Sequence, residues 1–430
     1  MVEIWLPYGK TEVSVRVRDE DLLAIVQLNE RPGSVDPRAE IERAFAYPLA
    51  SKRLSEIVDS DETFVIVLGM NEPTVILPIL EFVLKELRNA GVKDENVTVL
   101  VGSNFWASNN REQVFSLVTE NYKEVKTVLH DHLRSDTVLL GQSCSGTAVY
   151  MNKIFAESKF KLLLGEVSAN CLTAYTGGPE TLLQGAAGIQ TVRQCCSKIV
   201  ATDSRVGVIE QNPVFDDMRG IAELAKVDYA VNVVLNSKRQ LVAAFAGAPN
   251  DVFLQGIKLT EEMCKVHTDG KADVAVISAG GAPYDTNLYR AYRAIHTGLD
   301  LVKKDGALVL LAECAGGFGN RTFYEWMRRF RESKEIENEI KRNFEIGAEV
   351  AYFLSRALEY SRIYLVSVMP DYYANGVFRM RTARTVNAAL QLAIRAVGRD
   401  SKILVVPHGS NIVPVLPSAV GMSNIFKSEK

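Results

Sequence analysis

The chain has 430 residues, of which 47% are hydrophobic and 23% charged, and its formal net charge is −3. This length exceeds one typical domain and the composition supplies a sizeable apolar core, so we expect two folded domains. A charge so close to zero gives no electrostatic basis for binding nucleic acid or an anionic membrane. The first residues, MVEIWLPYGK, lack the pattern of a signal peptide, and proline and charged residues interrupt the apolar segment 74–87. We therefore expect a cytoplasmic protein that does not span a membrane.

Short apolar runs rich in β-branched residues recur along the chain, and each ends close to glycine or another small residue. They are FVIVLG (64–69), VTVLVGS (97–103), KLLLGEV (161–167), VAVISAGG (274–281), ALVLLAEC (307–314), RIYLVS (362–367) and KILVVPHG (402–409). Continuous apolar strands of this kind are typical of parallel sheets that are covered on both faces. Helical patterns occupy intervals at 74–89, 285–304 and 381–397, and a charged helix is expected at 327–343. The sequence predicts an α/β fold with mainly parallel, doubly wound sheets.

The polar segment HTDG at 267–270 precedes a new strand and marks the expected domain boundary, near 265–272. We therefore expect one domain over 1–268 and a second over 269–430. Ligands of such sheets bind beyond the carboxyl ends of the strands. The six cysteines show no C-x-x-C spacing, so a zinc ribbon or a thioredoxin-like motif is not predicted.

The most informative segment is 167–196, in which Thr176-Gly177-Gly178-Pro179 leads into a helix. A Gly-Gly-Pro sequence at a helix start lets backbone N–H groups face an anion. In its glycines and their spacing, this segment resembles the signature of the nickel-pincer lactate racemase family. The resemblance continues in IWLPYGKTEVSVRV at the amino end, in GGAPYDTNLY (280–289) and in AECAGGFG (312–319). It implies the two α/β domains of that family, facing a central cleft lined by loops 69–73, 103–106, 176–180 and 280–289.

The resemblance also implies a chemistry, namely that of an isomerase that racemises a 2-hydroxy acid. In that family a nickel-pincer nucleotide is tethered to a lysine and exchanges hydride with C2 of the acid, and a histidine completes the nickel site. Two further histidines exchange the hydroxyl proton, and an arginine binds the substrate carboxylate. The implied ligand is therefore a small anionic molecule.

The residues that match the family's reactive positions are different in this chain. Glu180 stands at the position of the tethering lysine, and Cys196 stands at that of the nickel-binding histidine. Phe105 and Asn170 stand at the positions of the first and second catalytic histidines. Glu72 stands at the position of the carboxylate-binding arginine. Gly177 and Gly178 match the cofactor-binding turn. In the second half, Tyr289, Arg290 and Arg293 match the family's Tyr-Gln-x-x-Lys.

Each replacement has a chemical consequence. A carboxylate at Glu180 cannot form the thioamide that a lysine amine forms, and neither Phe105 nor Asn170 can exchange a proton with a hydroxyl near neutral pH. Cys196 is a soft metal ligand in principle. The exchange of basic residues for Glu72 and Glu180 makes the cleft less positive, which disfavours a carboxylate substrate and a phosphorylated cofactor. We therefore expect no nickel-pincer nucleotide on the purified protein.

Three hypotheses follow for the function. The first is a degenerate member of the racemase family whose cleft binds a small ligand. The second is a racemase or epimerase of 2-hydroxy or sugar acids with altered cofactor handling, in which Glu72, Glu180, Cys196 and Arg290 are new functional groups. The third is a true racemase whose catalytic residues lie elsewhere. Convergence of those four side chains on one polar pocket would favour the second hypothesis over the first.

His130-Asp131-His132 places two imidazoles close together, which is compatible with a metal site. No third ligand is evident from the spacing of the remaining histidines. We interpret the pair as hydrogen-bonded histidines at the end of a strand.

Overall fold

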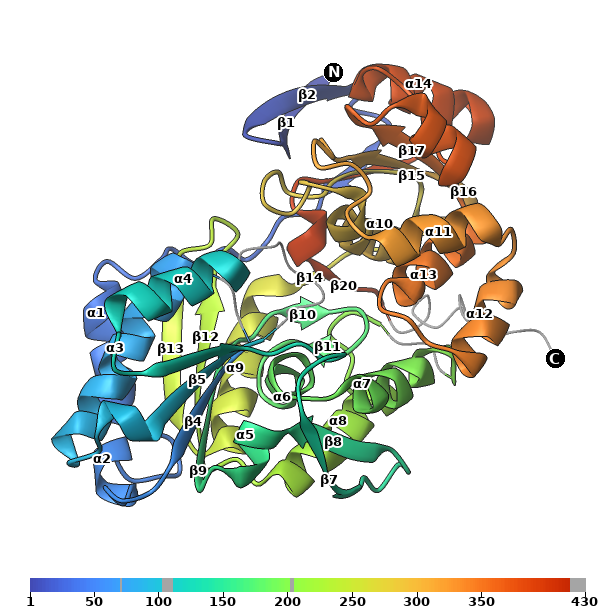
Figure 1. Ribbon diagram of the computed structural model, residues 1–430. Helices are drawn as coiled ribbons and strands as arrows, with labels where there is room; N and C mark the ends of the chain where they lie inside the picture. The colour runs from blue at the N-terminus through green and yellow to red at the C-terminus, as the bar shows by residue number, and fades with distance from the viewer. Residues whose placement is uncertain (70–71, 103–110, 202–204, 418–430) are drawn as a thin grey trace. The chain divides into compact units, whose positions relative to one another are not determined.

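A computed structural model describes residues 1–69, 72–102, 111–201 and 205–417 of the chain (Figure 1). The chain forms two compact units. The central unit comprises Glu30–Lys198 and Gly207–Glu262, and the terminal unit comprises Met1–Asn29, Ile199–Val206 and Met263–Lys430.

This division differs from the expected domains at the amino end of the chain. The change at 262/263 lies near the expected boundary, but Met1–Asn29 belong with the second half. The reason is strand pairing, because β3 (Leu22–Ile25) runs parallel to β19 (Ile403–Val406) at the edge of the second sheet. The hairpin of β1 (Val2–Tyr8) and β2 (Thr11–Val17) also buries its apolar side chains in the core of that unit. A pairing between the two ends of a chain leaves no local pattern in the sequence.

The central unit is built on a six-stranded sheet, within the part of the chain that the structure describes. Its order is β13-β12-β9-β4-β5-β6, and all neighbours are parallel except β12 and β13. The strands are β4 (Phe64–Leu68), β5 (Val97–Val101), β6 (Lys126–Leu129), β9 (Phe160–Glu166), β12 (Tyr229–Leu235) and β13 (Leu241–Gly247). The predicted parallel sheet is therefore confirmed in this unit.

Helices cover both faces of this sheet (Figure 1). One face carries α1 (Pro37–Ala46), α3 (Pro73–Asn89) and α4 (Arg111–Asn121), with α2 (Leu54–Ile57) beside α3. On the other face, α6 (Pro179–Gly185) packs against β4 and β9, and α8 (Pro213–Ala225) packs against α6. Phe253 of α9 (Pro249–Cys264) lies at Gly178, just before α6. Smaller elements complete the unit: η1 (Asp94–Asn96), β7 (Thr137–Gln142), β8 (Ala148–Asn152), α5 (Lys153–Glu157), β10 (Ala169–Asn170), β11 (Ala174–Tyr175) and α7 (Ile189–Cys196).

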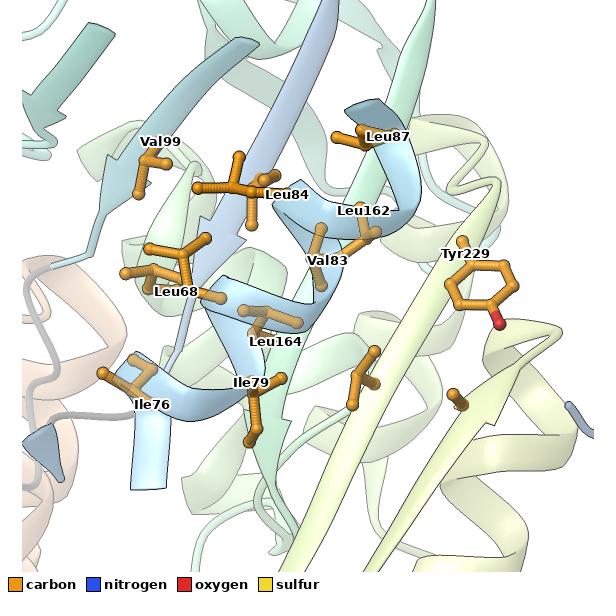
Figure 2. Close-up of a cluster of buried hydrophobic side chains, with 14 of the residues drawn as sticks. Leu68, Ile76, Ile79, Val83, Leu84, Leu87, Val99, Leu162, Leu164 and Tyr229 are labelled. Carbon is orange, nitrogen blue, oxygen red and sulfur yellow. The ribbon is translucent and has the colours of Figure 1, made fainter. Parts of the chain in front are cut away.

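Helix α3 shows how the sequence specifies this core. Its buried residues recur every three or four positions, which gives one apolar face. Figure 2 shows Ile76, Ile79 and Val83 of this face over Leu68 of β4 and Leu164 of β9. Burial of each such side chain contributes about 2 kcal/mol. The helix ends in a Schellman motif, in which Val92 N donates to Leu87 O across Gly91 at φ +85.

The terminal unit holds a second parallel sheet, with the order β18-β17-β16-β15-β19-β3 in its described residues. Its further strands are β15 (Ala272–Ser278), β16 (Val302–Leu311), β17 (Arg362–Val366) and β18 (Arg381–Thr382). The β1–β2 hairpin and α14 (Val386–Val397) cover one face, and α10 (Leu288–Leu301) and α13 (Ala348–Tyr360) pack against the other. Short elements of this unit are β14 (Lys265–His267), η3 (Tyr372–Val377), η4 (Gly409–Asn411) and β20 (Val413–Val415). The helical turn η2 (Ser197–Ala201) begins in the central unit and ends in this one.

The expected charged helix at 327–343 is wrong, because the chain forms two helices there. These are α11 (Arg321–Arg329) and α12 (Ser333–Arg342). The break is stabilised by Glu335, whose Oε2 accepts from the backbone N–H groups of Arg331 and Glu332 at 2.8 and 3.1 Å. A side chain in the first turn that accepts from the N–H groups just before a helix fixes the residue at which the helix begins. Across the residues that the structure describes, none of the helices has the length and apolar character needed to cross a membrane.

Candidate functional site

The carboxyl ends of β4 and β9 form the topological switch point of the central sheet. From β4 the chain continues to β5 and β6 on one side, whereas β9 enters on the other side of β4. Open α/β sheets bind ligands at such a point, because the loops that follow the two strands diverge there. Glu72 follows β4 as the residue before α3, and Glu166 is the last residue of β9.

Arg239 joins these two carboxylates. Its Nη1 and Nη2 donate to the two oxygens of Glu166 at 2.5 and 2.7 Å, and its Nε lies 3.6 Å from Glu72 Oε2. All three side chains are partly exposed, between 15% and 26%. Sequence reasoning missed Arg239 and Glu166. Glu166 ends the run KLLLGEV and could have been found as a strand-end residue, but Arg239 lies in the turn between β12 and β13, where nothing in the pattern marks it.

The turn at Gly177 and Gly178 lies beside Glu166. Both glycines have left-handed φ values, +81 and +48, and a Cβ on Gly178 would lie 2.5 Å from the ring of Phe253. Gly177 N donates to Glu180 Oε2 at 3.2 Å, so this N–H group of the turn is bonded to a side chain of the chain itself. The side chain of Glu180 is 1% exposed. Thr176 Oγ1 also donates to Glu166 O at 2.7 Å, so the turn is fixed to the end of β9.

Buried polar groups lie beneath this turn, where α6 rests on glycines at the strand ends. A Cβ on Gly165 would lie 2.5 Å from Thr181 Oγ1 and 2.9 Å from Asn232 Oδ1, and one on Gly69 would lie 2.8 Å from Thr181 Oγ1. The Thr181 hydroxyl is therefore between the ends of β4 and β9. Thr181 and Asn232 are 0% exposed, and neither the hydroxyl nor the amide has a hydrogen-bond partner among the described residues.

Two further predicted site residues of this unit have different surroundings. Asn170 is in β10, and its Oδ1 accepts from the backbone N–H groups of Leu172 and Thr173 at 2.8 and 3.2 Å. Its side chain therefore closes a local turn. Cys196 ends α7 and is 1% exposed. Phe105, with loop 103–106, lies outside the described residues.

The remaining predicted residues belong to the terminal unit, on the first turns of α10. Arg290 and Arg293 are half-buried. Tyr289 is buried and donates from its hydroxyl to Glu349 Oε1 at 2.7 Å. Burial raises the pKa of Glu349 to about 7, against opposing hydrogen bonds from Tyr289 and from Gly347 N. The carboxyl is therefore a buried acid that titrates near neutral pH.

In this unit, the turn at Gly9 is hydrogen-bonded to loop 280–289. Gly9 N in the β1–β2 turn donates to Asp285 Oδ2 at 2.6 Å, and Ala282 N donates to Gly9 O at 2.8 Å. Gly9 has a left-handed φ of +57, and a Cβ there would lie 2.5 Å from Glu313 Oε2, so this position favours glycine. The amino-terminal turn thus covers the carboxyl end of β15, and loop 280–289 is fixed to it.

The interpretation of His130 and His132 as hydrogen-bonded residues is confirmed. His130 Nε2 and His132 Nδ1 both contact Ala187 O, at 2.9 and 2.6 Å. Burial lowers the pKa of both rings, that of His132 to about 3. Within the described residues, no three His, Cys, Asp or Glu side chains are grouped as a metal ion requires.

Comparison with known proteins identifies the fold and its relatives. Residues 8–207 match the lactate racemase N-terminal domain, and residues 267–414 match the lactate racemase C-terminal domain. The chain belongs to the lactate racemase family. It is 28% identical to the lactate racemase of Thermoanaerobacterium thermosaccharolyticum in an alignment of 428 positions that covers 96% of this chain and 99% of that protein. It is 25% identical to the lactate racemase of Lactiplantibacillus plantarum, over 96% of this chain and 100% of that protein.

Solved structures agree with this family assignment. The apoprotein of the T. thermosaccharolyticum lactate racemase aligns with a TM-score of 0.84 at 26% identity, over 96% of this chain and 100% of that one. A Thermotoga maritima protein aligns with a TM-score of 0.63 at 12% identity, over 90% of this chain and 100% of its own, which shows a shared fold alone. The predicted two-unit α/β fold of the racemase family is therefore confirmed.

Proposed function

We propose that this protein is a degenerate member of the lactate racemase family, which has lost nickel-pincer chemistry and binds a small molecule at the carboxyl ends of β4 and β9. The observation that carries the proposal is the environment of Glu180. At the position of the tethering lysine stands a buried carboxylate that accepts from Gly177 N. A carboxyl group forms no thioamide, and its oxygen accepts from an N–H group that could otherwise face a phosphate.

The other replaced positions support the same proposal. The Asn170 amide is held by two backbone N–H groups and has no proton to exchange near neutral pH. Each missing general base lowers a rate by about 10²–10⁴-fold. Cys196 lies in no group of three metal-binding side chains among the described residues. These residues do not fit a nickel-pincer nucleotide.

A second candidate is a racemase or epimerase of 2-hydroxy or sugar acids with altered cofactor handling. The Tyr289–Glu349 pair favours it, because a buried acid with a pKa of about 7, bonded to a tyrosine hydroxyl, is suited to hold or move a proton. In this proposal Arg290 and Arg293 attract the small anion that the resemblance implies. A cytoplasmic location, without nucleic-acid or membrane partners, stays a prediction.

Intact-mass spectrometry and metal analysis test the degenerate assignment. The protein is co-expressed with the enzymes that synthesise the family's cofactor, and a lactate racemase of the family is treated in parallel as the positive control. We expect a mass equal to that of the polypeptide, no stoichiometric nickel and no interconversion of D- and L-lactate. A covalent adduct on any lysine, bound nickel, or racemisation above background contradicts the proposal.

A further inference from the structure

The hairpin of β7 and β8 leaves one edge of β7 unpaired. Within the described residues these two strands form a sheet of their own, which Figure 1 shows at the margin of the central unit. β7 has the sequence TVLLGQ, without a charged residue or a proline, and every residue of it is at least partly exposed. Val138 and Leu139 are 37% and 53% exposed, and Leu133, just before the strand, is 71% exposed. An uncharged edge strand with exposed apolar side chains is a template for pairing with another chain.

The hydrogen bonds of β8 show which backbone groups of β7 face this open edge. Tyr150 N donates to Thr191 Oγ1 at 2.7 Å, and Tyr150 O accepts from Gly188 N at 2.9 Å. The backbone of Tyr150 therefore points away from β7. Successive residues of a strand direct their N–H and C=O groups to opposite sides, so Met151 faces β7, where its register partner is Val138.

Thr137 and Leu139, on either side of Val138, therefore direct their N–H and C=O groups to the outside of the hairpin. The same alternation is seen two residues before Val138, where Lys153 N donates to Asp136 O at 2.8 Å. In the part of the chain that the structure describes, no strand other than β8 pairs with β7. The outward groups of β7 thus have the geometry of a strand that awaits a neighbour.

The edges of the six-stranded sheet in the same unit are protected, in contrast to that of β7. The outer edge of β13 accepts hydrogen bonds from Ser34 N and Leu49 N, at 2.6 and 2.8 Å. The opposite edge strand, β6, begins with the exposed Lys126. Coverage and charge are two means by which proteins prevent unwanted pairing at an edge, and β7 has neither.

We propose that the open edge of β7 is the contact surface for a second copy of this chain, with the two β7 strands paired antiparallel about a two-fold axis at Val138. Thr137 of each copy then lies opposite Leu139 of the other, and each such pair exchanges both of its N–H···O bonds. The two Val138 residues form a pair without mutual hydrogen bonds, with Cα atoms about 4.5 Å apart. The register shift between Leu139 and Gly141 lies outside the paired residues.

Charge and symmetry favour a second copy over a different partner. Asp136 lies opposite Leu140 of the other copy, and Arg134 lies opposite Gln142, so no two like charges meet. The strand itself offers no charge that would select a partner of opposite sign, whereas the exposed Val138 meets its own copy across the axis. A two-fold pairing also occupies both open edges, so association ends at the dimer.

Sedimentation equilibrium of the full-length protein tests the association. One pair of short strands buries less than the roughly 800 Å² per partner of a standard interface, so the dimer should be weak. Concentrations from about 1 μM to about 1 mM cover the corresponding dissociation constants, and we expect a reversible monomer–dimer equilibrium. Leu139→Lys should weaken it at least about tenfold, because it places a charge at the edge. Leu254→Lys is the matched control, since Leu254 of α9 is also 53% exposed, and it should leave the equilibrium unchanged.

Disulfide cross-linking tests the register. Cys144 is exposed and the other cysteines are buried, so Cys144→Ser provides the background. Val138→Cys then places two thiols at the two-fold axis, within the Cα separation that a disulfide spans. Diamide oxidises such a pair of thiols and is itself reduced. It should link Val138→Cys into a dimer at least about tenfold faster than Leu254→Cys, because pairing raises the local thiol concentration.

Three results overturn the proposal. They are a monomer over the whole concentration range, an unchanged equilibrium in Leu139→Lys, and equal cross-linking rates in Val138→Cys and Leu254→Cys. Circular dichroism and melting temperature establish that each variant is folded. None of these results bears on the loss of nickel-pincer chemistry, because β7 contains none of the residues on which that proposal rests.

Discussion

Glu349 gives the sharpest prediction of stability, because its burial costs free energy that depends on pH. Its folded pKa of about 7 lies above its ordinary value of 4.5. The folded state therefore holds a proton that the unfolded state releases between these two values. The contribution to stability is fully present below pH 4.5 and is lost as the pH rises through 7. A shift of this size corresponds to about 3 kcal/mol at pH 8.

The substitution Glu349→Gln removes this dependence. A glutamine keeps the shape, can accept from Gly347 N with its oxygen and can donate to the Tyr289 hydroxyl with its amide. We expect the variant to match the wild type at pH 4.5 and to be more stable by about 3 kcal/mol at pH 8. Urea unfolding at a series of pH values measures the difference, followed by the fluorescence of Trp326 in α11, which packs against α13.

Glu12→Gln is the matched control, since Glu12 is an exposed carboxylate in the same unit. Its stability curve should run parallel to that of the wild type. A stability curve of Glu349→Gln that also runs parallel to that of the wild type between pH 5 and 8 would show that the buried carboxyl titrates as it does in the unfolded chain.

Two further substitutions test the central unit. The pKa of His132 is lowered to about 3 from its ordinary value of 6.5. The neutral imidazole therefore contributes to the stability of the folded state above pH 6.5, and this contribution is lost as the pH falls toward 3. His132→Gln should therefore reduce the loss of stability between pH 6.5 and 5 by about 2 kcal/mol in acid denaturant titrations, and an unchanged slope would disprove it. Gly178→Ala should destabilise the unit by about 2 kcal/mol or more, because φ is +48 and the new Cβ meets Phe253. Gly376→Ala, where a Cβ meets nothing within 4 Å, should have little effect, and equal melting temperatures for the two variants would count against the steric argument.

The sequence by itself determined the fold class and most of the strands. The run FVIVLG at 64–69 became β4 and KLLLGEV became β9, because a continuous apolar run can be buried only in a sheet that is covered on both faces. The expected helix at 74–89 became α3, since its apolar residues recur with the helical period and Pro73 fits the first turn. The glycine motif 176–179 also fixed the turn before α6, where positive φ values demand glycine. These features depend on neighbours in the sequence.

The tertiary structure alone decided which charges meet. The resemblance places Glu72 at the expected position of the family's carboxylate-binding arginine, and nothing local showed that Arg239 would reach it from the turn after β12. The partner of Arg239, Glu166, is 73 residues away in sequence. Likewise, Met1–Asn29 joined the terminal unit because β3 found an edge position beside β19. Local patterns report propensity and burial, whereas ion pairs and strand neighbours depend on how distant segments pack.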